Sequence, residues 1–190
     1  LPYVASNTDS TIPTDVGVAP GHGALVRLIS EFAGVQPQVA GKPAPPLLRE
    51  TIARAGAGAP LMVGDRMDTD VLGAHAVGVP SLLVMTGVTT VRDLLAAPPR
   101  VRPTFVAADL RGLHESHPLP ADEAPGDEVR LNGWTVHVEH GELLVGGDGA
   151  EGDWLRAMCT AAWAWLDTTG EPVGINGLVV PPGFVSTVGR

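Results

Sequence analysis

Three carboxylates lie within six residues in the segment Val63-Gly64-Asp65-Arg66-Met67-Asp68-Thr69-Asp70. A short apolar run precedes them, and the glycine relieves the steric limits of a sharp turn from a strand into a loop. We therefore expect Asp65 to project from the carboxyl edge of a sheet. Hard cations such as Mg²⁺ take oxygen ligands, often one or two carboxylates. Asp65 is our predicted Mg²⁺ ligand, whereas simple helix capping explains Asp68 equally well.

Lys42 is the only lysine among the twelve basic residues, and it stands in the tripeptide Gly41-Lys42-Pro43. The tripeptide follows a predicted strand and precedes a predicted helix, 23 residues ahead of Asp65. That gap accommodates one helix and one strand, so both motifs can reach the same edge of a parallel sheet. An ammonium group there can neutralise a phosphate and a nearby carboxylate. We predict that Lys42 and Asp65 converge on a cation and a phosphate.

A third polar segment, Ser6-Asn7-Thr8-Asp9, is followed by Pro13 and by Pro20-Gly21-His22-Gly23. Taken alone, Asn7 and Asp9 are explained as turn formers, because short polar side chains stabilise turns locally. The segment gains interest only through its place in the order of motifs along the chain.

The elements that must position these residues alternate through the first 115 residues. The predicted strands cover 3–6, 37–40, 61–63, 81–85 and 105–107, and the predicted helices 20–32, 46–55, 70–77, 90–96 and 109–114. Alternation of short apolar strands with helices predicts an α/β fold with a Rossmann-like, doubly wound parallel sheet. Ligands of such sheets bind beyond the carboxyl ends of the strands.

A proline-rich linker at residues 116–128 separates this region from a second pattern. The pattern predicts a hairpin formed by residues 134–139 and 142–145, a helix at 152–168 and a last strand at 174–180. Together these elements predict a small α+β unit at 129–190. The glycine-rich segment Gly146-Gly147-Asp148-Gly149 is acidic and poorly suited to an anionic cofactor. We expect an accessory unit rather than a working transferase.

The composition of the chain limits the classes of partner that it is expected to bind. The net charge is −9, and residues 119–190 carry eleven acidic against three basic residues. Without a basic patch, nucleic acid is not an expected partner, whereas one local pocket can still bind a small phosphorylated metabolite. No apolar run reaches the roughly 20 residues of a membrane span. The single cysteine, Cys159, favours a reducing, cytoplasmic location and reads as a small buried hydrophobe.

Five motifs in order, from Ser6-Asn7-Thr8-Asp9 to Met85-Thr86-Gly87-Val88, closely resemble the haloacid-dehalogenase superfamily. The match is to its nitrophenylphosphatase/phosphoglycolate-phosphatase group, in which a large cap domain interrupts the core. The extra acidic unit is similar to that of actinobacterial glycerol-3-phosphate phosphatases, which carry an acetyltransferase-like extension. The resemblance implies that residues 1–18 leave the cap and re-enter the core, 19–115 form the core and 129–190 the extension.

The resemblance also implies roles. Lys42 would hold the transferring phosphoryl group and the nucleophile, and Asp65 would bind Mg²⁺ directly. Asp70 would support the site either by contacting the residues that bind the ion or through a metal-bound water. Asn7 and Asp9 would lie near the pocket as substrate-binding residues. The activity implied is Mg²⁺-dependent hydrolysis of a small phosphoester, with glycerol 3-phosphate favoured over phosphoglycolate and nitrophenyl phosphate.

The sequence also departs from the family pattern, and these departures are as informative as the matches. Family members attack phosphorus with an aspartate of a strand-ending Asp-x-Asp-Gly motif, and this chain contains none. The phosphate-binding Ser/Thr of the second family motif is also missing ahead of Asn7. We therefore expect the nucleophile, the cap and the rest of the N-terminal half to lie outside this chain, which alone should be inactive. The alternative is a non-catalytic, doubly wound regulatory or interaction module.

Overall fold

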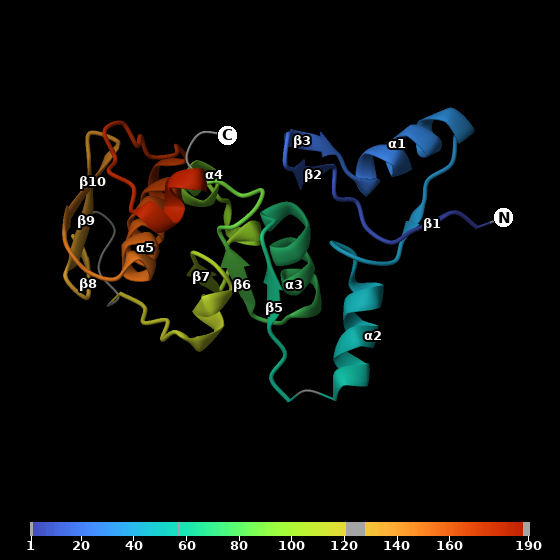
Figure 1. Ribbon diagram of the computed structural model, residues 1–190, viewed down its shortest axis with the longest axis horizontal. Coiled ribbons are helices and arrows are strands. Elements are labelled where there is room, and N and C mark those ends of the chain that lie inside the picture. Colours follow the sequence, from blue (N-terminus) through green and yellow to red (C-terminus); the bar gives the residue numbers. More distant parts are fainter. Residues whose placement is uncertain (1, 57, 121–127, 188–190) are drawn as a thin grey trace.

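The computed structural model describes residues 2–56, 58–120 and 128–187, which form a mixed α/β structure (Figure 1). Two parallel sheets, ordered β1-β4 and β5-β6-β7, are accompanied by a β2-β3 hairpin and by an antiparallel sheet ordered β10-β9-β8. The α/β class and the parallel pairing confirm the prediction. The expected single sheet is instead divided, because β4 and β5 are not hydrogen-bonded to each other.

The N-terminal region pairs its first and fourth strands in parallel, Val4 with Gln38 and Ala5 with Val39. Both strands therefore end at the same edge. The β2-β3 hairpin that lies between them in the sequence was not predicted, and it contains Pro13, a residue type that is uncommon inside strands. The elements are β1 (Val4–Ala5), β2 (Thr11–Thr14), β3 (Gly17–Pro20), α1 (His22–Ala33), β4 (Gln38–Val39) and α2 (Pro45–Ala55).

The central region carries a three-stranded parallel sheet in which Val63, Leu82 and Phe105 lie side by side. Each helix ends or begins at a local signal. Gly78 adopts a left-handed conformation after α3, and Thr90 accepts a hydrogen bond from Asp93 in a capping box that starts α4. The elements are β5 (Met62–Gly64), a π-helical turn (Met67–Val71), α3 (Leu72–Val77), β6 (Ser81–Val84), α4 (Val91–Leu95), a 3₁₀ turn (Pro99–Val101), β7 (Phe105–Ala107) and a second 3₁₀ turn (Leu110–His114).

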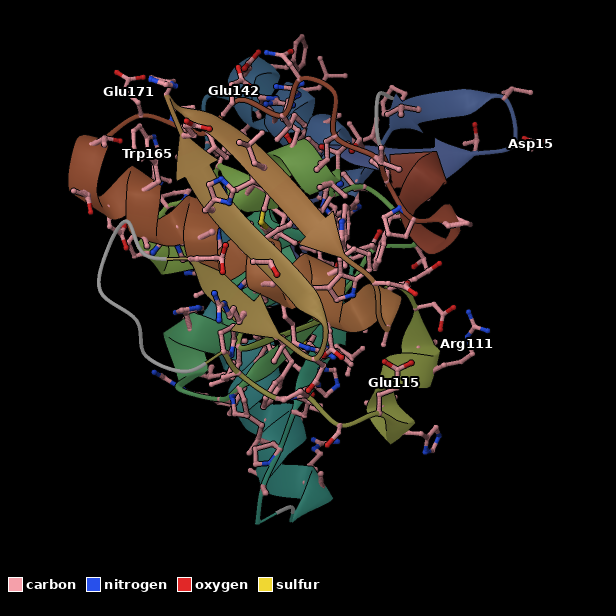
Figure 2. The ribbon with its side chains drawn as sticks, turned by 90° about the vertical axis from the view of Figure 1, so that its left-hand side faces the viewer. Asp15, Arg111, Glu115, Glu142, Trp165 and Glu171 are labelled. Carbon is pink, nitrogen blue, oxygen red and sulfur yellow. The ribbon has the colours of Figure 1, made fainter. Side chains whose placement is uncertain are left out.

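The C-terminal unit is an antiparallel sheet laid over one long helix (Figure 2). The turn between its two longest strands places His140 and Gly141 at positive φ, +50° and +81°. Its elements are β8 (Val129–Leu131), β9 (Trp134–Glu139), β10 (Glu142–Gly147), α5 (Glu151–Thr169) and a 3₁₀ segment (Pro182–Thr187). The predicted strand at 174–180 is wrong: Gly174 makes one isolated bridge to Glu142.

One hydrophobic core joins the central region to the C-terminal unit. Leu83 and Val106 project from the parallel sheet toward α5, where Leu155 and Met158 are fully buried in the same cluster. The other face of α5 packs on β8 and β9. Alternate residues of the parallel sheet, Leu82 among them, belong to a smaller cluster on its opposite face. The helix α5 is therefore a layer shared by two sheets.

Among the described residues, no helix is long and apolar enough to cross a bilayer. Part of the predicted linker, residues 121–127, lies outside the described residues. Cys159 is buried as predicted, and this burial raises the pKa of its thiol.

Candidate active site

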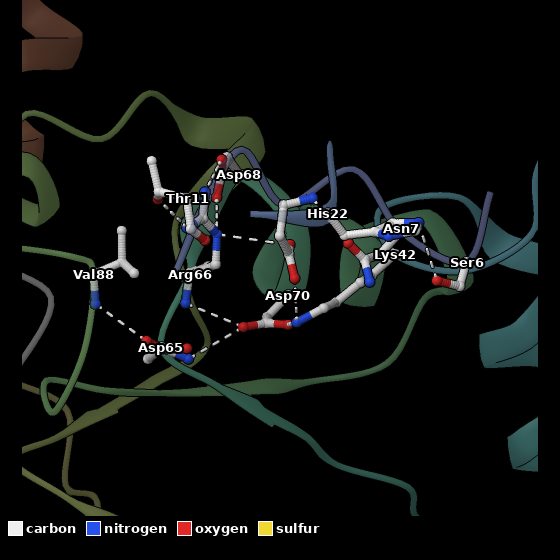
Figure 3. A network of polar contacts seen from close by, with 11 residues as sticks. Ser6, Asn7, Thr11, His22, Lys42, Asp65, Arg66, Asp68, Asp70 and Val88 are labelled. Atoms are coloured by element: carbon white, nitrogen blue, oxygen red, sulfur yellow. Dashed lines mark hydrogen bonds and ion pairs between the residues drawn. The ribbon is translucent and has the colours of Figure 1, made fainter. Parts of the chain in front are cut away.

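Asp70 is the centre of a polar network at the carboxyl ends of the parallel strands (Figure 3). Its Oδ2 accepts hydrogen bonds from the backbone N–H groups of Asp65 and Arg66, at 3.2 and 3.1 Å. The π-helical turn supplies this geometry, because the Asp70 and Val71 amides both donate to the Arg66 carbonyl. Gly64 makes room, since a Cβ there would overlap the Asp70 carboxylate. Asp70 thus fixes the backbone of the aspartate loop.

Lys42 reaches the same carboxylate from the other parallel sheet. Its Nζ donates to Asp70 Oδ1 at 2.7 Å and lies 3.3 Å from Asp9 Oδ2. The Gly41-Lys42-Pro43 loop can pass close to the Ser6 carbonyl because residue 41 is a glycine. A Cβ at this position would overlap that carbonyl. The structure therefore brings the lysine and aspartate motifs together, with Asp70 between Lys42 and the backbone of Asp65.

Asp65 follows β5 and faces the loop after β6. Its Oδ2 accepts from the Val88 amide at 3.1 Å, and its carbonyl accepts from the Thr89 hydroxyl at 2.7 Å. A side chain at Gly87 would collide with the Asp65 carboxylate. The Met85-Thr86-Gly87-Val88 motif therefore holds one carboxylate oxygen of Asp65 in place.

Asn7 and Asp9 form a tight loop at the end of β1. The Asp9 amide donates to Asn7 Oδ1 at 3.1 Å, and the Asp9 carbonyl accepts from the Gly23 amide at 2.8 Å. A Cβ on Gly21 or Gly23 would overlap the backbone of residues 8–11. The Pro20-Gly21-His22-Gly23 motif is thus the surface on which this loop rests.

Arg66 makes contacts that the sequence did not reveal. It forms a two-pronged ion pair with Asp68, at 2.7 and 3.0 Å, and donates to the Thr11 hydroxyl at 2.9 Å. Arg66 is buried, whereas Asp68 is 56% exposed. The short segment Asp15-Val16-Gly17 is a turn signal from which the hairpin that carries Thr11 could have been predicted.

The two cations of the network remain charged despite partial burial. Burial disfavours the charged form of Lys42, but the hydrogen bond and charge of Asp70, with a smaller effect of Asp9, raise its pKa. Burial opposes the charge of Arg66 in the same way, and Asp68 is the main cause of its raised pKa.

The donor set has the chemistry of a partial Mg²⁺ site. Asp65 presents a carboxylate oxygen at the strand edge, the ligand type that Mg²⁺ prefers. Among residues 2–56, 58–120 and 128–187, however, no three His, Cys, Asp or Glu side chains gather as a metal site. Asp65 fits the ion as one ligand, and the remaining ligands must come from water, substrate or further protein.

Residues 39–113, which contain Lys42, Asp65 and Asp70, match the HAD-hydrolase-like sequence family. This chain contains a HAD-like hydrolase domain. Residues 132–178 separately match the GCN5-related N-acetyltransferase-like family, which covers β9, β10 and α5 of the C-terminal unit.

Curated relatives of the HAD-like hydrolase domain are phosphatases. Over 170 residues the chain is 42% identical to D-glycerol 3-phosphate phosphatase of Mycobacterium tuberculosis, which covers 85% of this chain and 46% of the relative. It is 34% identical over 110 residues to acid sugar phosphatase of Staphylococcus epidermidis, covering 57% and 42%. The chain thus spans about half the length of the curated relatives it matches.

The solved structures that resemble this chain include phosphatases as well. Glycerol phosphate phosphatase from Mycobacterium tuberculosis in complex with magnesium superposes with a TM-score of 0.71 at 39% identity, covering 91% of this chain and 50% of that one. The 4-nitrophenylphosphatase from Thermotoga maritima gives a TM-score of 0.52 at 35% identity, covering 59% and 43%. Because the first match covers 91% of this chain, it includes most of the C-terminal unit.

Proposed function

We propose that the protein, once complete, is a magnesium-dependent phosphoric monoester hydrolase that acts on a small phosphorylated metabolite. The observation that carries this proposal is the link from Lys42 through Asp70 to the Asp65 backbone, all at one edge of the parallel strands. A cation and an anion-binding lysine at a strand edge are suited to phosphoryl transfer, where positioning and charge stabilisation dominate.

Each residue has a distinct task in this proposal. Lys42 binds the phosphoryl oxygens with the part of its ammonium group that Asp70 and Asp9 leave open. Asp70 keeps Lys42 and the Asp65 backbone in fixed relation. Asp65 would hold Mg²⁺, which when bound offsets negative charge on the phosphoryl group. Asn7 and Asp9 lie in the loop after β1, from which Asp9 contacts Lys42.

The attacking group belongs to the part that this chain lacks. An aspartate on a further strand would attack phosphorus and release the alcohol, and water would then hydrolyse the aspartyl-phosphate. The described part of the chain offers a place for such a strand, because β5 pairs with β6 along one edge only.

The missing N-terminal half is therefore the proposed partner. The helix α1 supports this, because it exposes an apolar stripe of Leu25, Leu28, Ile29 and Phe32, with Phe32 94% exposed. Apolar stripes of this kind mark surfaces that another segment covers. The single buried cysteine is consistent with the proposed cytoplasmic location.

Glycerol 3-phosphate is the favoured substrate, because the relative from Mycobacterium tuberculosis that matches 85% of the chain bears that activity in its name. Phosphoglycolate and nitrophenyl phosphate are the competing substrates. The residues that select among them are expected in the missing cap, so a panel of the three esters is the direct comparison.

The test is a phosphate-release assay of the complete protein with and without Mg²⁺. We expect turnover that needs Mg²⁺ and that Asp65→Asn abolishes, while Asp15→Asn at the exposed hairpin tip leaves it unchanged. Full activity of Asp65→Asn would reject the site. Absence of turnover with every ester, together with a reading frame lacking an upstream aspartate strand, would favour the non-catalytic module.

A further inference from the structure

Four side chains form a row of alternating charge beside the Asp65 loop (Figure 3). Asp70 Oδ1 lies 2.7 Å from Lys42 Nζ, which lies 3.3 Å from Asp9 Oδ2. The other oxygen of Asp9, Oδ1, lies 3.7 Å from Arg66 Nε. Asp9 is therefore the bridge between the only lysine and a buried arginine.

Asp9 is fixed from both sides of its backbone. Its amide donates to the Asn7 side chain, its carbonyl accepts from Gly23, and the neighbouring Thr8 amide donates to the Lys42 carbonyl at 3.3 Å. The use of Asn7 Oδ1 within this turn leaves that oxygen less suited to a substrate. The loop is thus held in one conformation that presents the Asp9 carboxylate to Lys42.

The Asp9 carboxylate is largely enclosed and incompletely satisfied. Oδ1 is buried and accepts no hydrogen bond from the described residues, although Arg66 is close. A buried carboxylate without a full set of donors is costly and persists where its charge is used. Here that charge acts on Lys42, which Asp70 contacts as well.

We propose that Asp9 is a positioning residue that aims the Lys42 ammonium group, rather than a residue that contacts the substrate. Asp70 and Asp9 each engage one part of the ammonium group, which leaves the remaining N–H for the phosphoryl group. Arg66 offsets the second oxygen of Asp9 and, through Thr11, ties the hairpin to the same loop. This inference rests on the proposed phosphatase function.

The physical gain is pre-organisation. A lysine side chain has about 2 kcal/mol of rotamer entropy, so one ion pair alone leaves the ammonium group several orientations. A second carboxylate from a separately anchored loop removes most of them before substrate binds. Misplacing a catalytic group by about 1 Å can cost on the order of a hundredfold in rate.

Because Lys42 is the only lysine of this 190-residue chain, the chain itself allows a direct test. Selective ¹³C labelling of lysine gives one side-chain signal, that of Lys42, whose mobility NMR relaxation reports. We expect Asp9→Asn to lower the order parameter of the Lys42 side chain toward the flexible range, below about 0.6. Asp15→Asn, the same change at the exposed tip of the hairpin, should leave it as in the parent protein.

Kinetics of the complete protein supply the second measurement. Asp9→Asn should lower kcat about tenfold or more with KM within about twofold, because the substrate loses no contact of its own. Asp9→Glu should restore part of kcat, since it keeps the charge. If Asp9→Asn does not fold, as judged by circular dichroism, Asp9→Glu takes its place in both measurements with an intermediate effect expected.

The outcomes separate this inference from the proposed function. Unchanged Lys42 mobility in Asp9→Asn overturns the inference, whether or not the protein hydrolyses phosphoesters. A selective rise in KM overturns it as well, because that result makes Asp9 a substrate-binding residue. Lack of activity in the complete protein rejects the phosphatase, and the lysine signal of this chain still decides whether Asp9 restrains Lys42.

Discussion

Residues 2–56 and the described residues that follow them, 58–120 and 128–187, differ sharply in how they pack. The first region contributes Ala5 and Val26 to the buried apolar residues, and no residue of α2 is buried. The second contains the whole core shared by the parallel sheet, α4 and α5. Yet the site draws on both, with Lys42 and Asp9 from the first and Asp65 and Asp70 from the second.

This contrast teaches how the site is assembled. The aspartate loop rests on a packed sheet, whereas the lysine loop is attached by ion pairs and backbone hydrogen bonds beside it. The exposed apolar stripe of α1 is the surface that the proposed N-terminal half would cover.

The largest expected effect comes from the shared core. Trp154 is fully buried and stacks on Phe184 at 5.5 Å between ring centroids. Trp154→Ala should lower the free energy of unfolding by about 3–5 kcal/mol, because it opens a cavity that the surroundings cannot fill. Urea unfolding of the chain measures it.

The matched change in the first region is Phe32→Ala. Phe32 is nearly fully exposed, so the free energy of unfolding of this chain should change by less than about 0.5 kcal/mol. Equal losses from the two substitutions would contradict the contrast between the regions.

A buried ion pair gives the next largest effect. Arg156 pairs with Asp153 at 2.7 Å and donates to the Val106 carbonyl on β7. Arg156→Ala leaves the buried Asp153 carboxylate without its cation, with only the hydrogen bond from Asn132, and should cost about 3 kcal/mol in thermal or urea unfolding. Arg130→Ala, at an exposed pair with Glu128, is the control and should change stability little.

A smaller effect is expected across the boundary of the two regions. Lys42→Met removes a charge-assisted hydrogen bond to buried Asp70 and should cost about 2 kcal/mol. In the Lys42→Met variant, amide hydrogen exchange should be faster in residues 6–11 than in β6. Uniform loss of protection throughout the chain would show instead that the regions unfold as one unit.

The smallest effect concerns an exposed brace between α5 and the turn at Pro99–Val101. Arg102 donates two hydrogen bonds to Asp167, at 2.6 and 2.7 Å, and these lower the pKa of that carboxyl. Asp167→Asn should cost less than about 1 kcal/mol near neutral pH, because solvent screens the pair.

The pH dependence of this brace has a definite sign. A lowered carboxyl pKa gives stability that is present above the unfolded pKa of about 3.9 and is lost as the pH falls through the lower folded value. The difference between the parent protein and Asp167→Asn should therefore vanish in acid. A difference that persists at pH 2 would contradict the ion pair.

Local sequence signals were sufficient for many elements. The strand at Phe105–Ala107 and the helix ending at Ala55 lie where apolar periodicity and Gly56 place them. The signals failed where tertiary contacts override them, as in the β2-β3 hairpin with Pro13 and the segment after Gly174. Roles for Asn7, Asp9, Lys42, Asp65 and Asp70 stay predictions.

The sequence alone determined which groups can do chemistry, because a single lysine, three clustered aspartates and the glycines beside them are properties of residue type and spacing. Only the tertiary structure decided how these groups connect. Hydrogen bonds and ion pairs act over about 3 Å, a distance that spacing along the chain cannot specify. For that reason the link of Lys42 to Asp70, the bridge at Asp9 and the reach of Arg66 to Thr11 emerged only from the folded arrangement.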